Sequence, residues 1–253
     1  MVSNLQQYRE SHQPSSLPEY TLDEWLASLD WKQGEHFIIM GPTGTGKTTV
    51  VHPILDRREY VIVMAVKHFD DTLDRFKNGH EYGRERYNII KRWPPTYPRH
   101  RVVYWTKPKN LDKLSEQAKS IHKTLNTLYK QGGWTIVVDD AGYVTGTLGL
   151  GSAVGVLLNQ GRSSYITMVL VVTRPSSVIA KVPKEALTQP RHKVLFKFEN
   201  EDELKACAAI ANISLYDMRR FQAMLETNPQ KGFSDFLYAG KGRLCIVRNR
   251  KEF

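Results

Sequence analysis

The chain has 253 residues, of which 41% are hydrophobic and 25% are charged, and this composition is typical of a globular protein with a sizeable core. No apolar stretch reaches the roughly 20 residues of a membrane span, and the first residues lack the apolar segment of a signal peptide, so we expect neither a membrane protein nor a secreted one. The net charge of +10 is a weak indication of a polyanionic partner.

The first 20 residues are polar with scattered prolines, a composition typical of a flexible arm. We expect residues 21–253 to form a single domain. Its first element is a predicted short helix from Thr21 to Leu29, because Thr21 suits the N-cap position and Glu24 stands three residues later, as in a capping box.

A glycine-rich loop follows the first predicted strand. The apolar run at 36–40 indicates a buried strand, and the sequence GPTGTGKT fills residues 41–48, directly before a predicted helix. In this order of strand, loop and helix, the glycines let backbone N–H groups point at a phosphate, and the helix N-terminus adds partial positive charge. The expected nucleotide-binding residues are Gly41, Pro42, Thr43, Gly44, Thr45, Gly46, Lys47, Thr48 and Thr49.

Two of these side chains have expected roles in the chemistry. Lys47 would bring a full positive charge to the β- and γ-phosphates, and the Thr48 hydroxyl would bind Mg²⁺. The alternative is a glycine turn that binds nothing, but such a turn does not require every fixed position of the motif. We therefore expect the chain to bind a nucleoside triphosphate together with Mg²⁺, with ATP as the first candidate.

The next predicted elements alternate between strands and helices. Residues 60–66 are apolar throughout, as in a strand that is buried on both faces of a parallel sheet. Residues 69–77 predict a helix, and residues 101–106 predict another strand. Asn110 is a candidate N-cap for a long amphipathic helix that ends at Gln131.

Residues 84–109 form a basic segment interleaved with aromatic residues. Its basic residues greatly outnumber its one acid, and they are Arg84, Arg86, Lys91, Arg92, Arg99, Arg101, Lys107 and Lys109. Cations suit phosphates and rings suit bases, so the basic segment fits a nucleic-acid surface. It fits equally well a solvated loop whose aromatic residues, such as Trp93, anchor it to the domain. The sequence leaves both interpretations open.

A second part of a nucleotide site follows the run at 134–138. This run predicts a buried strand that ends in two carboxylates, Asp139 and Asp140. Parallel strands end at one edge of a sheet, so we expect these acids beside the phosphate loop. Asp139 would then hold Mg²⁺, mostly through water, and Asp140 would polarise the attacking water. Alternatively, the two acids only mark where a buried strand meets solvent.

The remaining predicted elements complete the domain. Residues 166–172 indicate a further buried strand, and Thr173 at its end is placed to touch the γ-phosphate or the attacking water. Next come a strand at 193–198, helices near 202–211 and 215–226, and a hairpin over 236–247. The alternation of strands and helices predicts a three-layer α/β domain with a mostly parallel sheet.

Several of these stretches together resemble the HerA/FtsK superfamily of P-loop ATPases, which pump DNA. The matching stretches are GPTGTGKTT (41–49), TIVVDDAG (135–142), GRSSYITMVLVVTRPSS (161–177), QPRHKVLFKFENEDELK (189–205) and FLYAGKGR (236–243). The resemblance covers the chain from about residue 34 to its end. It implies a RecA-like P-loop NTPase domain of the additional-strand type, with a mostly parallel central sheet and a C-terminal hairpin.

The resemblance also implies a ring, a hexamer or a pentamer, with double-stranded DNA in its channel and ATP between subunits. An arginine from the neighbouring subunit would complete each site, and such an arginine is typically worth about 10³–10⁵ in rate. Arg191 and Arg162 are the candidates, and Lys193 is a third because the match is loose at that point. Each of them could instead form a surface salt bridge or a DNA contact.

The glycine-rich stretch at 142–151 falls where the family projects a loop toward the channel. It contains no lysine or arginine, so its backbone N–H groups and Tyr143 or Thr145 would meet DNA there. The alternative is a flexible connector between a strand and a helix.

The compact chain is most similar to the genome-packaging ATPases of phages and related viruses, which dock on a portal or a capsid vertex. The expected setting is then the cytoplasm of a host cell. The two cysteines agree with a reducing compartment, because Cys207 and Cys245 have neither disulfide nor metal-site spacing.

Three other functions stay open. A cellular or plasmid DNA-pumping ATPase would share the same motifs. A nucleotide or small-metabolite kinase also begins with a phosphate loop, although no arginine-rich lid follows the two acids. A slow, nucleotide-gated assembly protein is the third, since Asp140 stands where the family usually has glutamate and Thr173 where it usually has glutamine.

Overall fold

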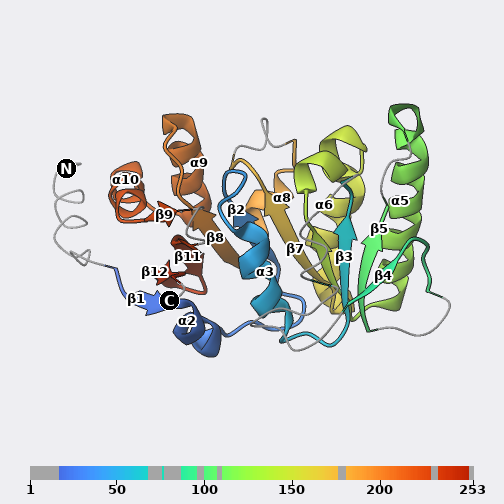
Figure 1. Ribbon diagram of the computed structural model, residues 1–253, viewed down its shortest axis with the longest axis horizontal. Coiled ribbons are helices and arrows are strands. Elements are labelled where there is room, and N and C mark those ends of the chain that lie inside the picture. The colour runs from blue at the N-terminus through green and yellow to red at the C-terminus, as the bar shows by residue number, and fades with distance from the viewer. Residues whose placement is uncertain are drawn as a thin grey trace.

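The computed structural model describes residues 17–67, 76, 87–95, 100–106, 110–175, 181–228 and 233–250. They form a ten-stranded sheet with helices on both faces, and a separate two-stranded ribbon (Figure 1). The strands are β1 (Glu19–Thr21), β2 (Phe37–Met40), β3 (Val61–Ala65), β4 (Asn88–Ile90), β5 (Arg101–Trp105), β6 (Thr135–Val138), β7 (Thr167–Val172), β8 (His192–Phe196), β9 (Thr227–Asn228), β10 (Phe233–Ser234), β11 (Phe236–Gly240) and β12 (Arg243–Arg248). The helices and helical turns are α2 (Leu22–Ser28), α3 (Lys47–Leu55), η1 (Leu111–Lys113), α5 (Leu114–Gln131), η2 (Tyr143–Thr147), α6 (Gly151–Gln160), η3 (Gly161–Ser164), α8 (Glu185–Thr188), α9 (Glu201–Ala211) and α10 (Leu215–Ala223).

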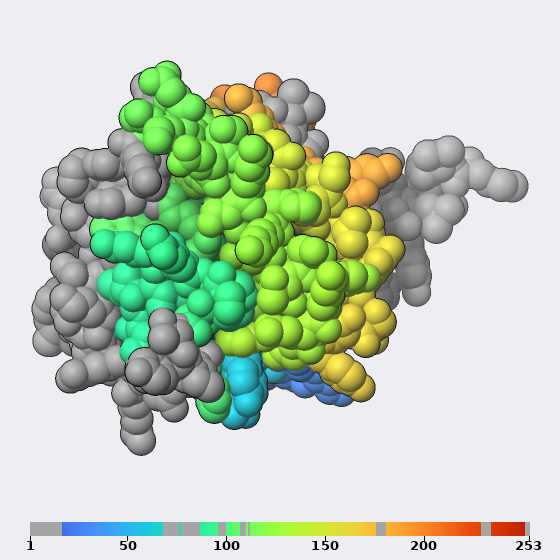
Figure 2. Space-filling view, turned by 90° about the vertical axis from the view of Figure 1, so that its right-hand side faces the viewer, coloured from blue at the N-terminus to red at the C-terminus, as the bar shows by residue number. Residues whose placement is uncertain are grey.

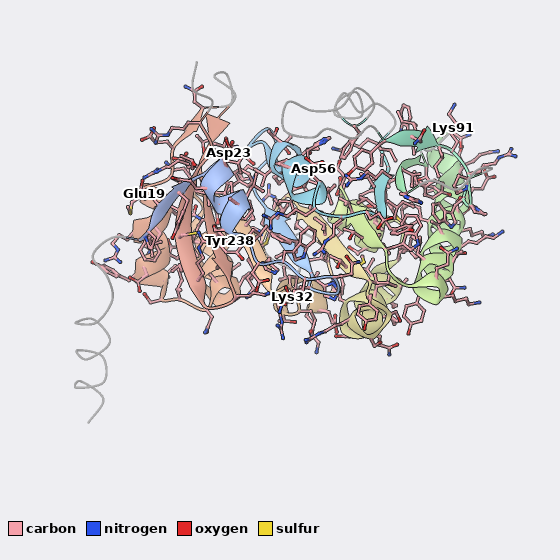
Figure 3. All side chains as sticks on the ribbon, turned by 90° about the horizontal axis from the view of Figure 1, so that it is seen from below. Glu19, Asp23, Lys32, Asp56, Lys91 and Tyr238 are labelled. Atoms are coloured by element: carbon pink, nitrogen blue, oxygen red, sulfur yellow. The ribbon has the colours of Figure 1, made fainter. Side chains whose placement is uncertain are left out.

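The strand order in the large sheet is β1-β12-β11-β8-β2-β7-β6-β3-β5-β4. All neighbours from β8 to β4 are parallel, while β11 is antiparallel to both β8 and β12. Glu19 on β1 and Lys91 after β4 lie at opposite ends of the molecule (Figure 3). The prediction of a mostly parallel sheet with a C-terminal hairpin is therefore confirmed.

Two hydrophobic cores lie on the two faces of the sheet, because consecutive residues of a strand point to opposite faces. In β2, Ile38 and Met40 pack into one core, and Phe37 and Ile39 pack into the other. Helices α5, α6, α9 and α10 cover the first face, and α2 and α3 cover the second. Figure 2 shows α5 in green and α6 in yellow, side by side at one end of the molecule. The three layers are as predicted.

Helix α2 begins with the predicted capping box. The Thr21 hydroxyl accepts the Glu24 N–H, and the Glu24 carboxylate accepts the Thr21 N–H over 2.8 Å. The prediction that Glu19 and Tyr20 belong to a flexible arm is wrong, because both lie in strand β1. These two residues instead pair in parallel with β12, and residues 1–16 lie outside the described residues.

The described parts of the basic segment are anchored to the domain. Trp93 meets Trp134 edge to face, with ring centroids 5.4 Å apart. Arg101 is buried and donates hydrogen bonds to the carbonyl oxygens that follow α3. Lys91 and Arg92 are exposed. In this part of the chain the aromatic rings thus act as anchors, and exposed cations are left between them.

Some local predictions differ from the structure. Asn110 is extended but makes no capping hydrogen bond, and the helix starts with the 3₁₀ turn η1 before α5. The stretch at 142–151 is not one long loop, because η2 is a π-helical turn and only residues 148–150 connect it to α6. The helix expected at 69–77 lies outside the described residues, apart from Phe76. Among the described helices, none has the length and apolar character that a membrane span requires.

Candidate nucleotide-binding site

The phosphate loop follows β2 directly, and its first residue is bonded to the neighbouring strand. The Gly41 N–H donates to the carbonyl oxygen of Val172, at the end of β7, over 3.2 Å. A Cβ atom on Gly41 would lie 2.7 Å from the Cβ of Phe196, so a side chain does not fit there. Gly44 and Gly46 both have a φ of +84°, in the left-handed region that favours glycine. The glycines of the motif therefore follow from the geometry of the loop.

Lys47, the first residue of α3, points back at the loop. Its Nζ atom donates to the carbonyl oxygens of Gly41 and Pro42, each over 2.7 Å. Burial lowers the pKa of Lys47 to about 8; the attraction of Asp139 opposes this shift and the repulsion of Lys67 adds to it. Bound phosphate would stabilise the charged ammonium, because attraction between opposite charges is strong where water is excluded.

Thr48 and Asp139 bring a hydroxyl and a carboxylate together. Thr48 Oγ1 donates to Asp139 Oδ1 over 3.4 Å, and the Asp139 side chain at the end of β6 is only 9% exposed. Hard oxygen ligands of this kind bind Mg²⁺ along with phosphate oxygens and water. Across the described ranges, no cluster of three or more His, Cys, Asp or Glu side chains could hold a metal. The pair fits a magnesium ion that arrives with a nucleotide.

Asp140 and Thr173 lie at the same edge of the sheet. The Asp140 carboxylate accepts the Tyr143 N–H over 3.0 Å, so it caps the π-helical turn η2. Thr173 is exposed and follows the residue whose carbonyl oxygen binds the phosphate loop. The predicted residues that the structure brings to this edge are Lys47, Thr48, Asp139, Asp140 and Thr173.

The candidate arginines lie at the opposite edge of the sheet. Arg191 precedes His192, the first residue of β8, which pairs with Phe37, the first residue of β2. Arg162 lies in η3, before β7 begins. The four residues of β2 separate the two edges by about 13 Å. Lys193 is half-buried near the start of β8, and burial lowers its pKa. These cations therefore lie away from the phosphate loop of their own chain.

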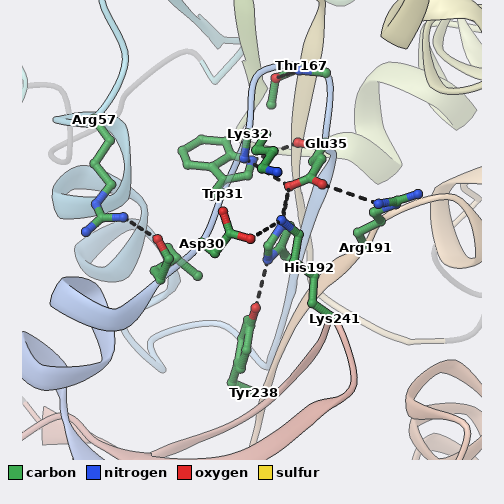
Figure 4. Close-up of polar contacts among 12 residues, drawn as sticks. Asp30, Trp31, Lys32, Glu35, Arg57, Thr167, Arg191, His192, Tyr238 and Lys241 are labelled. Atoms are coloured by element: carbon green, nitrogen blue, oxygen red, sulfur yellow. Dashed lines mark hydrogen bonds and ion pairs between the residues drawn. The ribbon is translucent and has the colours of Figure 1, made fainter.

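Arg191 belongs to a charged cluster that sequence reasoning missed (Figure 4). We call Glu35, Arg191, His192 and Lys241 the Glu35 cluster. The buried Glu35 carboxylate lies 3.4 Å from the Arg191 guanidinium, 2.9 Å from Lys241 Nζ and 3.3 Å from His192 Nε2. Burial raises the pKa of Glu35, but hydrogen bonds from the Lys32 N–H, Lys241 and His192 outweigh it and bring the pKa to about 2. Glu35 and His192 are 157 residues apart in the chain, so no local pattern indicates the cluster.

The expected DNA contacts of the glycine-rich stretch are occupied within the domain. Thr145 is buried, with its hydroxyl 2.6 Å from the carbonyl oxygens of both Ala141 and Lys181. Tyr143 donates its hydroxyl to Gln117 Oε1 over 2.8 Å. The expectation that Thr145 meets DNA is therefore wrong, and Tyr143 has a partner inside the domain.

Lys67 joins the site although no motif marks it. It follows β3, and its Nζ atom lies 3.4 Å from Asp139 Oδ2. The available signal was a charged residue directly after the apolar run at 60–66. That strand is parallel to β6, so it too ends at the edge of the phosphate loop.

No protein-family model matches the sequence, and no curated protein matches it either. Solved structures do match the fold. The genome packaging NTPase B204 from Sulfolobus turreted icosahedral virus 2, in complex with AMPPCP, has a TM-score of 0.58 at 16% identity, over 86% of this chain and 98% of that chain. VirB4 of Thermoanaerobacter pseudethanolicus has a TM-score of 0.56 at 10% identity, over 86% of this chain and 89% of that chain.

A third solved structure extends this set. EssC (ATPases 2 and 3) from Geobacillus thermodenitrificans has a TM-score of 0.52 at 10% identity, over 88% of this chain and 41% of that chain. At such identities the likeness establishes the fold alone, because one fold can carry many functions. The chain therefore has the P-loop NTPase fold of these solved structures, which is the fold that the resemblance of its sequence implied.

Proposed function

We propose that this protein is an ATP-hydrolysing motor that moves DNA, and that it packages a viral or phage genome as a ring. The observation that carries the proposal is the meeting of Lys47, Thr48 and Asp139 at one edge of the sheet, with the Thr48 and Asp139 oxygens 3.4 Å apart. A glycine loop, a lysine, a hydroxyl and a carboxylate at the ends of parallel strands are the groups that bind Mg²⁺ and ATP in P-loop enzymes.

Each residue would have a defined task in hydrolysis. The N–H groups of the loop would bind phosphate oxygens, and Lys47 would neutralise charge on the β- and γ-phosphates. Thr48 and Asp139 would hold Mg²⁺, which supplies further positive charge to the phosphates. Asp140 would orient the attacking water, and Thr173 would hydrogen-bond to that water or to the γ-phosphate.

The position of the candidate arginines supports a homo-oligomeric ring, either a hexamer or a pentamer. Arg191 and Arg162 lie at the edge of the sheet that faces away from the phosphate loop of their own chain. In a head-to-tail ring, this edge of one subunit can face the nucleotide site of the next. Arg191 is half-exposed, so its guanidinium is accessible to such a neighbour.

Likeness to known proteins supports DNA translocation and packaging in particular. B204 is named a genome packaging NTPase, and almost its whole chain is matched. The proposal includes double-stranded DNA as the substrate, a portal or capsid vertex as the docking partner, and the host cytoplasm as the setting. The net charge of +10 suits a polyanionic substrate. A cellular or plasmid DNA pump with the same site is the alternative.

One observation favours a second, slower function. The Asp140 carboxylate accepts the N–H of Tyr143, and aspartate is one methylene shorter than the glutamate usual in the family. A carboxylate that caps a helical turn has less freedom to orient a water molecule. A nucleotide-gated assembly protein with slow hydrolysis is therefore the second candidate.

Phosphate release, measured with and without long double-stranded DNA alongside the mass in solution, tests the proposal. We expect turnover that rises severalfold with DNA in a ring-sized species. Lys47→Ala should abolish turnover, and Lys119→Ala on the exposed side of α5 is the matched control. Absence of phosphate release with DNA present would leave the slow switch. Phosphoryl transfer to a small acceptor would instead identify a kinase.

A further inference from the structure

We propose that Lys67 is a second phosphate-binding lysine of the nucleotide site. It pairs with Asp139 in the protein alone and contacts the γ-phosphate in the ATP complex. This inference rests on the proposed function, because it names a further residue of the same ATP site. It also assigns Lys67 a specificity, since ADP has no γ-phosphate to contact.

The sheet places Lys67 beside Asp139, the residue that follows β6. Strand β3 is parallel to β6 and pairs Met64 with Val138, so Lys67 and Asp139 leave the sheet as neighbours. Lys67 Nζ lies 3.4 Å from one Asp139 oxygen, and Thr48 Oγ1 lies 3.4 Å from the other. A single carboxylate therefore stands between the hydroxyl and the ammonium. Phosphate oxygens bound beside Thr48 and Asp139 would lie within reach of this ammonium.

The backbone at Lys67 is fixed, while its side chain is half-exposed. Gln117 Nε2 donates to the carbonyl oxygen of Val66 over 3.1 Å, and Trp105 Nε1 donates to that of Lys67 over 2.9 Å. Lys67 also carries its charge on a flexible stem, whose exposed fraction is 49%. A fixed backbone with a mobile charged end suits a group that exchanges one anionic partner for another.

The buried Gln117 links Lys67 to the second acid of the site. Its Oε1 atom accepts the Tyr143 hydroxyl over 2.8 Å, and the Tyr143 N–H donates to Asp140 over 3.0 Å. The amide of Gln117 thus bonds on one side to the end of β3 and on the other to the turn that Asp140 caps. Lys67 is therefore positioned by the same frame as Asp140, unlike a lysine of an unconstrained surface.

An ion pair with Asp139 alone is the simpler interpretation of Lys67. The Lys67 side chain is 49% exposed although the Asp139 side chain is only 9% exposed, and ion pairs that solvent reaches contribute little to stability, so such a pair would have little effect on the fold. It would also set a cation against the carboxylate that Mg²⁺ requires. A lysine that moves to the γ-phosphate has an anionic partner both in the protein alone and in the ATP complex, and this is why we favour phosphate binding.

The test measures equilibrium binding of fluorescent ATP and ADP analogues in the presence of Mg²⁺. Lys67→Met should weaken binding of the ATP analogue about tenfold or more, because a charge-assisted contact is lost. It should change binding of the ADP analogue by less than about twofold. Lys67→Arg should recover most of the ATP affinity. Lys119→Met on α5, also an exposed lysine, is the matched control.

Other outcomes separate the possible failures. Equal weakening of both nucleotides, or no change in either, would overturn the assignment of Lys67. If Lys67→Met instead binds both nucleotides more tightly and requires less Mg²⁺, then Lys67 only neutralises the charge of Asp139. That result would also overturn the assignment. Failure of the unaltered protein to bind either analogue would remove the proposed ATPase function, and the role of Lys67 with it.

Discussion

The parallel strands of the central sheet carry charged groups at both of their ends, at the edge of the phosphate loop and at the opposite edge. The surroundings disfavour the charged form at one edge and favour it at the other. At the edge of the phosphate loop, burial lowers the pKa of Lys47 to about 8, so the surroundings disfavour its charged form. At the other edge, the hydrogen bonds to Glu35 bring its pKa to about 2 against the effect of burial, so the surroundings favour its charged form. A lowered pKa means that the surroundings destabilise the charged form of a base, or stabilise the charged form of an acid.

This difference separates a structural cluster from the proposed nucleotide site. The Glu35 carboxylate has donors from three segments of the chain, namely the Lys32 N–H, the adjacent Arg191 and His192, and Lys241, and these satisfy its charge within the domain. Among the described residues, the hydrogen-bond partners of Lys47 Nζ are only backbone carbonyl oxygens, and an added anion would stabilise its charge further. Arg191 also contacts Glu35, but its side chain is half-exposed, so it is the most accessible member of the Glu35 cluster.

The largest expected effect tests whether the two edges act together across subunits. Arg191→Ala should lower DNA-stimulated turnover about 10³-fold or more, because the transition-state charge loses a cation. Mixing this variant with Lys47→Ala should restore part of the turnover, since the Lys47→Ala chain still offers Arg191 to its neighbour. Phosphate release as a function of the mixing ratio is the measurement.

The matched control for this experiment is Arg219→Ala, whose guanidinium pairs with Glu201 on the surface. It should leave turnover unchanged. Full activity of Arg191→Ala alone would exclude Arg191 as the neighbour's arginine, and the same mixing experiment with Arg162→Ala would then test the other candidate. Loss without recovery on mixing would place the effect of Arg191 within its own chain.

A smaller effect is expected for Glu35→Gln, which removes the negative charge at the centre of the Glu35 cluster. The free energy of unfolding should fall by about 2–3 kcal/mol, because Lys241 and His192 lose a buried carboxylate acceptor. Urea denaturation measures this change, and ATP binding should stay the same because the nucleotide edge is untouched. Glu201→Gln, at an exposed ion pair, should cost little. An equally small cost for Glu35→Gln would contradict a structural role for the Glu35 cluster.

Acid pH should weaken the fold through buried histidines near the same edge. Burial lowers the pKa of both His36 and His192 from 6.5 to about 4. Between these values the unfolded chain binds more protons than the folded one, so stability falls as the pH falls. Each histidine should contribute up to about 1.4 kcal/mol per pH unit. Glu35 extends the loss below its unfolded pKa. Urea unfolding across this range is the measurement, and a flat profile would contradict the prediction.

Much of the fold was predictable because local patterns encode it. Strands β2, β3, β6 and β7 are apolar except for the threonine that begins β6 and β7, as burial on both faces of a parallel sheet favours. The capping box at Thr21 and the turn at Lys241 and Gly242 depend on neighbouring residues only. The phosphate loop and Asp139 were expected together because parallel strands end at one edge.

The rest depends on contacts between distant parts of the chain. Strands β1 and β4 have three residues each, too few to show an alternating or apolar pattern. The pairs of Glu35 with His192 and of Lys67 with Asp139 form only once the sheet is assembled. Asn110 has the right residue type for a cap, but the helix begins with a 3₁₀ turn and the side chain makes no capping bond.

The smallest expected effect tests whether the charge of Glu35 is compensated by any single cation. Lys241→Met removes the ammonium that lies 2.9 Å from Glu35 and 2.7 Å from Asp30. Glu35 would keep its hydrogen bonds from the Lys32 N–H and His192, so the free energy of unfolding should fall by only about 1 kcal/mol. Methionine leaves the positive φ of this turn residue equally strained, so the change reports on the charge. A loss in urea denaturation as large as that of Glu35→Gln would mean that Lys241 alone compensates the carboxylate, and that the two edges differ less than their pKa values indicate.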